Sequence, residues 1–192
     1  MRLVLATRND NKLRELGRVM IGVALEPLPE GVALPPEDGA TFAANALGKA
    51  HAAAAALGRA AIADDSGIEA KALGGAPGIL SARFAGPGAT DAANLAKLRA
   101  DAPAGSRLRY VCVMAYAEPG GEERTFEGVC GGTLADEERG SGGFGYDPAF
   151  LPDDVADGRT MAELSDAEKD AISHRGRAAR ALLAWLEEGR PG

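Results

Sequence analysis

Two adjacent aspartates, Asp64 and Asp65, follow the apolar run Ala60–Ala63 and precede Ser66 and Gly67. Successive side chains of an extended strand point to opposite faces, so both carboxylates enter one cleft only where the chain already turns. The pair Ser66-Gly67 favours such a turn. Carboxylates at a strand's end suit Mg²⁺, which takes one or two of them together with water and phosphate oxygens. The alternative is an Asx-turn, in which the aspartates only cap backbone amides.

A second candidate is the polar segment from Thr7 to Lys12, which joins a short apolar run to a helical pattern. The loop between a strand's carboxyl end and a helix N-terminus exposes backbone N–H groups and the positive end of the helix dipole. Such a loop is suited to an anion, and Lys12 adds a mobile positive charge. The GxxxxGK[ST] pattern of a P-loop is absent from the sequence. A solvated helix cap with a surface lysine is the alternative.

Two further groups lie later in the chain. Phe144 and Tyr146 stand among glycines, where a backbone approaches a ligand closely and an aromatic face offers a stacking surface for a planar base. The alternative there is a tight turn with buried aromatics. Lys169, His174 and Arg175 offer donors for phosphate and carbonyl oxygens, although a single histidine on a helix is more often a surface or core residue. Taken together, the four groups indicate a nucleoside triphosphate site.

Composition narrows the function classes. The 192 residues carry a net charge of −7, which argues against non-specific binding to a nucleic-acid backbone. Cys112 and Cys130 form no CxxC or Cys/His cluster, so we do not expect a zinc site. We expect a reduced, cytoplasmic setting, because the cysteines are so few. The longest N-terminal apolar run is far below the ~20 residues of a membrane span, and the sequence shows no signal peptide.

The elements that must position these residues follow from apolar spacing and capping signals. We predict strands at Leu3–Ala6, Ala60–Ala63, Arg107–Glu118 and Thr125–Leu134, the last two forming a hairpin. Helices are predicted after Asn9 or Asp10, after Thr41 and after Thr90, and from a capping box at Ser165–Glu168 to about Glu188. The Pro- and Gly-rich residues 21–38 are expected to lie on the surface. The result is an α/β fold with a mixed sheet in one domain, residues 1–192.

Five segments in this order carry a resemblance to a known family. They are Ala6-Thr7-Arg8-Asn9-Asp10-Asn11-Lys12, Asp64-Asp65-Ser66-Gly67, Leu73-Gly74-Gly75-Ala76-Pro77-Gly78 with Ser81-Ala82-Arg83, Gly143-Phe144-Gly145-Tyr146-Asp147-Pro148, and Ala171-Ile172-Ser173-His174-Arg175. The chain closely resembles the Ham1-type noncanonical purine nucleoside triphosphate pyrophosphatases, the inosine/xanthosine triphosphatases, from Met1 to about Trp185.

The resemblance implies hydrolysis of dITP, ITP or XTP to the monophosphate and pyrophosphate. It also implies Mg²⁺ dependence, a homodimer, and an elongated mixed β-sheet flanked by helices, with two lobes and a central cleft.

The roles of individual residues are likewise carried over by the resemblance. Asp65 would be the proton acceptor and, with Glu37, a metal ligand. The other site residues would contact the substrate: Thr7, Arg8, Asn9, Asp10, Asn11 and Lys12 at the triphosphate, Ser66, then Phe144, Gly145, Tyr146 and Asp147 at the nucleoside, and Lys169, His174 and Arg175, the last two at the purine's carbonyl edge.

Two positions depart from the family pattern. Ala44 stands where a Glu is common, and Asp170 stands where an Asn is common after Lys169. The first removes any metal or supporting role of that Glu, and the second alters the charge near Lys169. Two other functions stay open: a nucleotide-binding regulatory module without turnover, and a pyrophosphatase for other altered nucleotides, as in the distantly similar Maf-type proteins.

Overall fold

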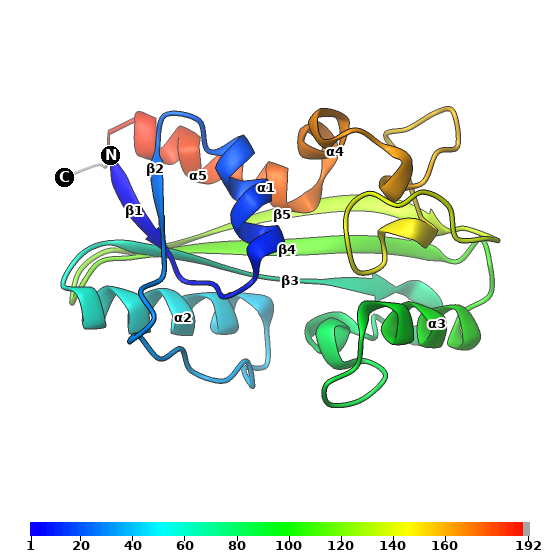
Figure 1. Cartoon of the computed structure of the whole chain (residues 1–192), viewed down its shortest axis with the longest axis horizontal. Helices are drawn as coiled ribbons and strands as arrows, with labels where there is room; N and C mark the ends of the chain where they lie inside the picture. The colour runs from blue at the N-terminus through cyan, green and yellow to red at the C-terminus, as the bar shows by residue number, and fades with distance from the viewer. Residues whose placement is uncertain (190–192) are drawn as a thin grey trace. The chain divides into compact units, whose positions relative to one another are not determined.

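A computed structural model describes residues 1–189. Its strands form one six-stranded sheet in the order β2-β1-β3-β4-β5-β6 (Figure 1). The pairs β1–β2 and β1–β3 are parallel, and β5–β6 is antiparallel, so the predicted mixed sheet is confirmed. The strands are β1 (Arg2–Leu5), β2 (Ala24–Pro27), β3 (Ala61–Ala70), β4 (Arg107–Ala117), β5 (Glu123–Leu134) and β6 (Phe150–Pro152).

Five α-helices and four short 3₁₀ helices are described in residues 1–189. The α-helices are α1 (Asp10–Val19), α2 (Phe42–Leu57), α3 (Asp91–Asp101), α4 (Asp166–Ile172) and α5 (His174–Glu187). The 3₁₀ helices are η1 (Lys71–Leu73), η2 (Gly78–Arg83), η3 (Asp147–Ala149) and η4 (Met161–Glu163). Within the described chain, none of the helices has the length and apolar character needed to span a bilayer.

The chain divides into two compact units. Within the described residues, the first contains residues 1–65, 112–128 and 175–189, and the second contains residues 66–111 and 129–174. In the first unit α2 lies on one side of the sheet and α1 and α5 lie on the other, whereas in the second α3 and α4 take opposite sides (Figure 1). Each unit is assembled from separate stretches of chain, so the boundary does not divide the sequence into two consecutive domains. The single domain expected over residues 1–192 stays a prediction.

Each unit has an apolar core of its own. In the first, β1, the start of β3 and the end of β4 pack against α1 and α5, with Leu16 and Leu182 fully buried. In the second, β3, β4 and β5 pack against α3 and the residues around β6, with Leu98 and Phe150 fully buried. From Tyr110 to Ala117, β4 is buried on both faces, so its alternating pattern does not mark a solvent-facing side.

The capping signals of the sequence are confirmed. The Asn9 side chain accepts from the N–H groups of Asn11 and Lys12 at the start of α1. Thr41 and Thr90 cap α2 and α3, and Ser165 forms a reciprocal capping box with Glu168 at the start of α4. The hairpin of β4 and β5 is also present, closed by a hydrogen bond from Glu118 N–H to the Glu122 carbonyl, 2.9 Å.

Two structural expectations were wrong, and one strand was not predicted. The segment of residues 21–38 contains a short strand, β2, which pairs in parallel with β1. No turn follows Asp65, because β3 continues to Ala70, and Asp64 and Asp65 therefore lie in the middle of a strand. The last helix is broken at Ser173, whose backbone is extended (φ −63°, ψ 151°). The apolar spacing did not reveal this break, because Ile172 of α4 and Ala179 and Leu182 of α5 all pack against a core.

Candidate functional site

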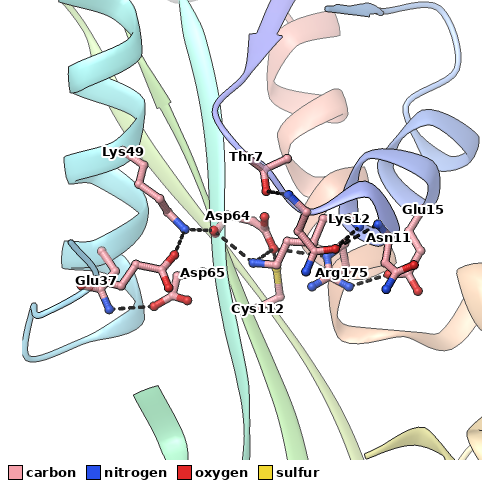
Figure 2. Close-up of polar contacts among 12 residues, drawn as sticks. Thr7, Asn11, Lys12, Glu15, Glu37, Lys49, Asp64, Asp65, Cys112 and Arg175 are labelled. Atoms are coloured by element: carbon pink, nitrogen blue, oxygen red, sulfur yellow. Dashed lines mark hydrogen bonds and ion pairs between the residues drawn. The ribbon is translucent and has the colours of Figure 1, made fainter. Parts of the chain in front are cut away.

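Asp64 is the centre of a buried ionic network in the first unit (Figure 2). Its Oδ2 lies 3.0 Å from Lys12 Nζ and 3.2 Å from Arg175 Nε. Arg175, only 1% exposed, also pairs with Glu15 on α1. Burial alone would raise the pKa of Asp64, but the charges of Lys12, Arg175 and Lys49 outweigh it and lower that pKa below its usual range. Asp64 is therefore a permanent carboxylate that anchors α1 and α5 to β3.

The thiol of Cys112 on β4 borders the same carboxylate, with Sγ 3.8 Å from Asp64 Oδ2. Burial, followed by the nearby Asp64 charge, raises the pKa of this thiol to about 12. Cys112 therefore stays protonated at neutral pH and cannot serve as a nucleophile. Both Cys112 and Cys130 are buried free thiols.

Asp65 points to the opposite side of β3, as strand alternation requires. Asn45 on α2 donates from Nδ2 to Asp65 Oδ2 (2.8 Å), while its own Oδ1 accepts from Gly39 N–H (2.8 Å). Burial is the largest influence on the Asp65 pKa and raises it; the Asn45 hydrogen bond opposes burial, and the Glu37 charge adds to it. The two neighbouring aspartates thus have opposite pKa shifts, and Asp65 is the one that accepts a proton more readily.

Glu37 lies in the loop before α2 and is held by Lys49, a buried lysine on that helix. Lys49 Nζ also donates to the backbone carbonyl of Asp64, 2.6 Å away. One ammonium therefore ties the Glu37 loop to β3 (Figure 2).

The residues of this region fit a hard divalent cation. Among residues 1–189, no three His, Cys, Asp or Glu side chains gather into a set that could hold a metal by themselves. Mg²⁺ does not need such a set, because it typically takes one or two carboxylates and shares its other positions with water and phosphate oxygens. The charge of Glu37 raises the pKa of Asp65, so the two carboxylates lie near enough to repel each other. A cation held by both would relieve that repulsion.

The Thr7–Lys12 loop is folded on itself. Asn9 N–H donates to Thr7 Oγ1 (3.1 Å), and Asn9 Oδ1 accepts from two N–H groups of α1. The Arg8 guanidinium faces a different segment, where it donates to the carbonyl oxygens of Leu28, Pro29, Glu30 and Val32 at 2.7–3.2 Å. The structure thus brings Lys12 to the carboxylates of β3, whereas Arg8 braces residues 28–32.

Asp147 is the centre of a second polar cluster, in the second unit. Its Oδ2 accepts from Lys169 Nζ (2.7 Å) and from Phe144 N–H (2.9 Å), and its Oδ1 accepts from the Tyr110 hydroxyl (3.0 Å). Lys169 Nζ also lies 5.0 Å from the centre of the Phe144 ring, a cation–π distance. These contacts bring together three of the predicted residues: Phe144, Asp147 and Lys169.

The other predicted residues of the second unit lie differently. Tyr146 is buried and donates from its hydroxyl to the Ser81 carbonyl (2.7 Å), so its ring is part of the core. Gly145 N–H donates to Asp91 at the start of α3 (2.8 Å). Ser66 is half-buried on β3.

His174 and Arg175 both follow the break at Ser173, at the start of α5, but their side chains have different surroundings. The His174 imidazole stacks on Tyr110, with ring centres 4.5 Å apart and planes 7° from parallel, whereas Arg175 joins the Asp64 network of the first unit. A contact of either residue with a purine stays a prediction.

Sequence reasoning missed four residues that complete these clusters: Glu15, Asn45, Lys49 and Tyr110. Asn45 and Lys49 carried a readable signal, because they stand one helical turn apart, each beside an alanine of the buried face of α2. Glu15 and Tyr110 carried none, since each shares a regular amphipathic pattern with its neighbours.

An open hollow of about 490 Å³ in the second unit contains none of the predicted residues. Two of its three cations, Arg107 and Arg109, are paired with Asp153 and Glu69, and Lys71 is the third. The candidate functional residues are those of the polar clusters around Asp64, Asp65 and Asp147.

The fold and these clusters define an α/β protein whose central strand carries two carboxylates surrounded by lysines and an arginine. A sequence model of the Ham1 family matches residues 3–185. The dITP/XTP pyrophosphatase of Mycolicibacterium paratuberculosis is 50% identical over 196 residues, covering 96% of this chain and 95% of that protein. The dITP/XTP pyrophosphatase of Mycobacterium tuberculosis H37Rv is 49% identical over 200 residues, covering 96% of this chain and 95% of the relative.

Solved structures agree with this match. A HAM1 protein from Coxiella burnetii superposes with a TM-score of 0.87 at 39% identity, over 98% of this chain and all of that one. The Ham1 protein of Staphylococcus aureus gives a TM-score of 0.84 at 38% identity, over 99% of this chain and all of that one. The chain belongs to the Ham1 family.

Proposed function

We propose that this protein hydrolyses the noncanonical purine nucleoside triphosphates dITP, ITP and XTP to the monophosphate and pyrophosphate, which removes them from the nucleotide pool. Family membership and relatives that are dITP/XTP pyrophosphatases support the reaction. The observation that carries the proposal is Asp65, a largely buried carboxylate with a raised pKa, coupled to Glu37 and positioned by Asn45. A group with these properties is suited to accept a proton from water.

The proposed step is an in-line displacement at the α-phosphorus. The oxygen of a water molecule forms a bond to this phosphorus, and the bond to the oxygen that bridges the α- and β-phosphates breaks. Pyrophosphate leaves with the electron pair, and the water's proton passes to Asp65. Lys12, held by Asp64, donates to phosphate oxygens and offsets their negative charge.

Glu37 and Asp65 would hold Mg²⁺, which when bound neutralises phosphate charge and lowers the pKa of water. Lys49, which now contacts Glu37, keeps that carboxylate beside β3. A homodimer is proposed with the enzyme on the family resemblance alone, and a cytoplasmic setting on the two unclustered cysteines.

Base selection is assigned to the second unit and the residue that follows it. Hypoxanthine and xanthine carry a carbonyl at position 6, where adenine carries an amino group. A donor from His174 or Arg175 would pair with the carbonyl and be mismatched with the amino group, and such mismatches discriminate strongly in a desolvated site. The cluster around Asp147 would hold Phe144 and the following turn against the nucleoside.

The direct test is a substrate panel with Mg²⁺ in which the products are identified. We expect dITP, ITP and XTP to give monophosphate and pyrophosphate, with ATP and GTP cleaved much more slowly. Release of orthophosphate, or a preference for ATP, would contradict the proposal. Tight nucleotide binding without product would support the regulatory module, and a preference for modified pyrimidines in the same panel would support a Maf-like role.

Asp65→Asn tests the carboxylate itself. We expect kcat to fall by about 10²–10⁴ with an unchanged melting temperature, since the amide oxygen can still accept from Asn45. Asp101→Asn, on the exposed part of α3, is the matched control and should leave kcat unchanged. Near-normal turnover of Asp65→Asn would remove this residue from the mechanism.

A further inference from the structure

Tyr110 is a buried aromatic residue on β4 that contacts both His174 and Asp147 in the second unit. Its ring is stacked nearly parallel on His174, and its hydroxyl donates to Asp147. It also packs against Phe150, with ring centres 4.7 Å apart and planes tilted by 51°. A strand in the middle of a sheet is a rigid support, so these three contacts fix the position of the Tyr110 ring.

The hydroxyl of Tyr110 completes the coordination of Asp147. With Tyr110 on Oδ1, and Lys169 and Phe144 N–H on Oδ2, both carboxylate oxygens have protein donors. Burial and the Asp147 charge raise the pKa of Tyr110 well above its ordinary value. The phenol therefore stays protonated and remains a donor.

We propose that Tyr110 is a positioning residue for base recognition: its ring sets the plane of the His174 imidazole, and its hydroxyl holds Asp147 and with it the Phe144 turn. This inference rests on the proposed function, in which His174 reads the purine edge. The role of the ring follows from the dependence of hydrogen-bond strength on angle. A hydrogen bond weakens steeply as it bends, so an imidazole that can rotate loses its preference for one base over another.

Two substitutions separate the ring from the hydroxyl. Tyr110→Phe keeps the stack and removes the donor to Asp147, and we expect KM for ITP to rise about threefold, with the ITP/ATP ratio of kcat/KM retained. Tyr110→Leu removes both, and we expect that ratio to fall by about tenfold or more.

Tyr116 provides the matched control. It lies on the same strand, is fully buried, donates to the carboxylate of Glu118 and packs edge-on against Trp185, so it is comparable in size, burial and bonding. Tyr116→Leu should lower stability but leave the ITP/ATP ratio unchanged. An equal fall in both variants would show a general structural effect and overturn the proposal.

A double-mutant cycle tests whether Tyr110 acts through His174. In a His174→Ala background, Tyr110→Leu should produce no further loss of discrimination, because the residue that it positions is absent. Additive losses in ITP/ATP discrimination would overturn the proposal.

A spectroscopic readout separates this inference from the proposed function. In the nucleotide-free protein, ¹⁵N–¹H side-chain spectra should show shifted and broadened His174 signals in Tyr110→Leu, and nearly unchanged signals in Tyr110→Phe and Tyr116→Leu. Unchanged His174 signals in Tyr110→Leu would overturn the positioning role whatever the substrate is. If the wild-type protein showed no preference for ITP over ATP, the proposed function would fail, and the histidine signals would still decide whether Tyr110 orients His174.

Discussion

At Gly143 the backbone is left-handed (φ +68°), and a Cβ there would lie 2.0 Å from Asp147 Oδ2 and 2.9 Å from Lys169 Nζ. Asp147 cannot move aside cheaply, because three donors hold its carboxylate. A side chain at this position would therefore disrupt the second polar cluster as well as strain the chain.

Gly145 makes this prediction testable, because it has nearly the same φ of +66° but open space around its Cβ position. We expect Gly145→Ala to cost about 1 kcal/mol of unfolding free energy from backbone strain alone. Gly143→Ala should cost about 2 kcal/mol more, for the broken contacts of Asp147, and should raise KM for ITP. Urea denaturation of both variants measures the difference, and equal losses would contradict the role of Asp147.

Lys49 is a buried lysine whose replacement leaves a buried carbonyl and a carboxylate short of one donor. We expect Lys49→Met to lower the free energy of unfolding by about 2 kcal/mol. Lys71→Met, at an exposed lysine, should change it by no more than about 0.5 kcal/mol. If denaturation gave the same small effect for both, Lys49 would not be holding the Glu37 loop to β3.

What the sequence could reveal at this scale was residue type rather than geometry. The paired aspartates were recognisable as unusual, but their opposite pKa shifts depend on tertiary structure: burial raises that of Asp65, and Lys12 and Arg175, 52 and 111 positions from Asp64, lower that of Asp64. Arg8 was expected at the triphosphate because it lies in the right segment, yet its side chain extends to residues 28–32. A motif specifies position along the chain and does not specify where a long side chain points.

At the scale of elements, the start of α4 combines capping with an ion pair. Glu168 accepts from Ser165 N–H (2.8 Å) and pairs with Arg159 (2.8 Å). The Arg159 hydrogen bond, with help from Ser165, lowers the pKa of Glu168 from 4.5 to about 2. A lowered folded-state pKa adds stability above the unfolded value, and this stability disappears as pH falls through the folded value.

Glu168→Gln should therefore destabilise the protein at neutral pH, and its difference from the wild type should shrink between pH 4.5 and 2. Denaturant titrations at several pH values measure this. A difference that is the same at pH 7 and pH 3 would show that the charge of Glu168 contributes nothing.

Helix starts were predictable because caps are local: Asn9, Thr41, Thr90 and Ser165 each bond within three residues. The end of β3 and the break at Ser173 were not. A serine-glycine pair is compatible with both a turn and a strand, and only pairing with neighbouring strands keeps residues 66–70 extended. Tertiary contacts decided both cases.

At the scale of the whole molecule, the first unit is built from three separate stretches of chain. The helix α5 returns the chain to this unit, where Ala178, Ala179 and Leu182 enter the core formed largely by residues 3–20 and 62. The unit therefore cannot be complete until nearly the whole chain has been synthesised.

Leu182→Ala should accordingly lower the free energy of unfolding by about 3 kcal/mol, because the leucine is fully buried. Leu183→Ala, at a partly buried neighbour, should cost clearly less. Thermal and denaturant unfolding measure both, and a smaller loss at position 182 than at 183 would contradict the assigned core.

The ionic network of the first unit has a consequence for how a polyanion is received. Three cations, Lys12, Lys49 and Arg175, are set against four carboxylates, Glu15, Glu37, Asp64 and Asp65, and each of the seven is linked to at least one other by an ion pair or by its effect on a pKa. With every group ionised this set carries one more negative charge than positive. A bare triphosphate would therefore meet no surplus positive charge in this set, and we predict that nucleotide uptake is weak in a chelating buffer.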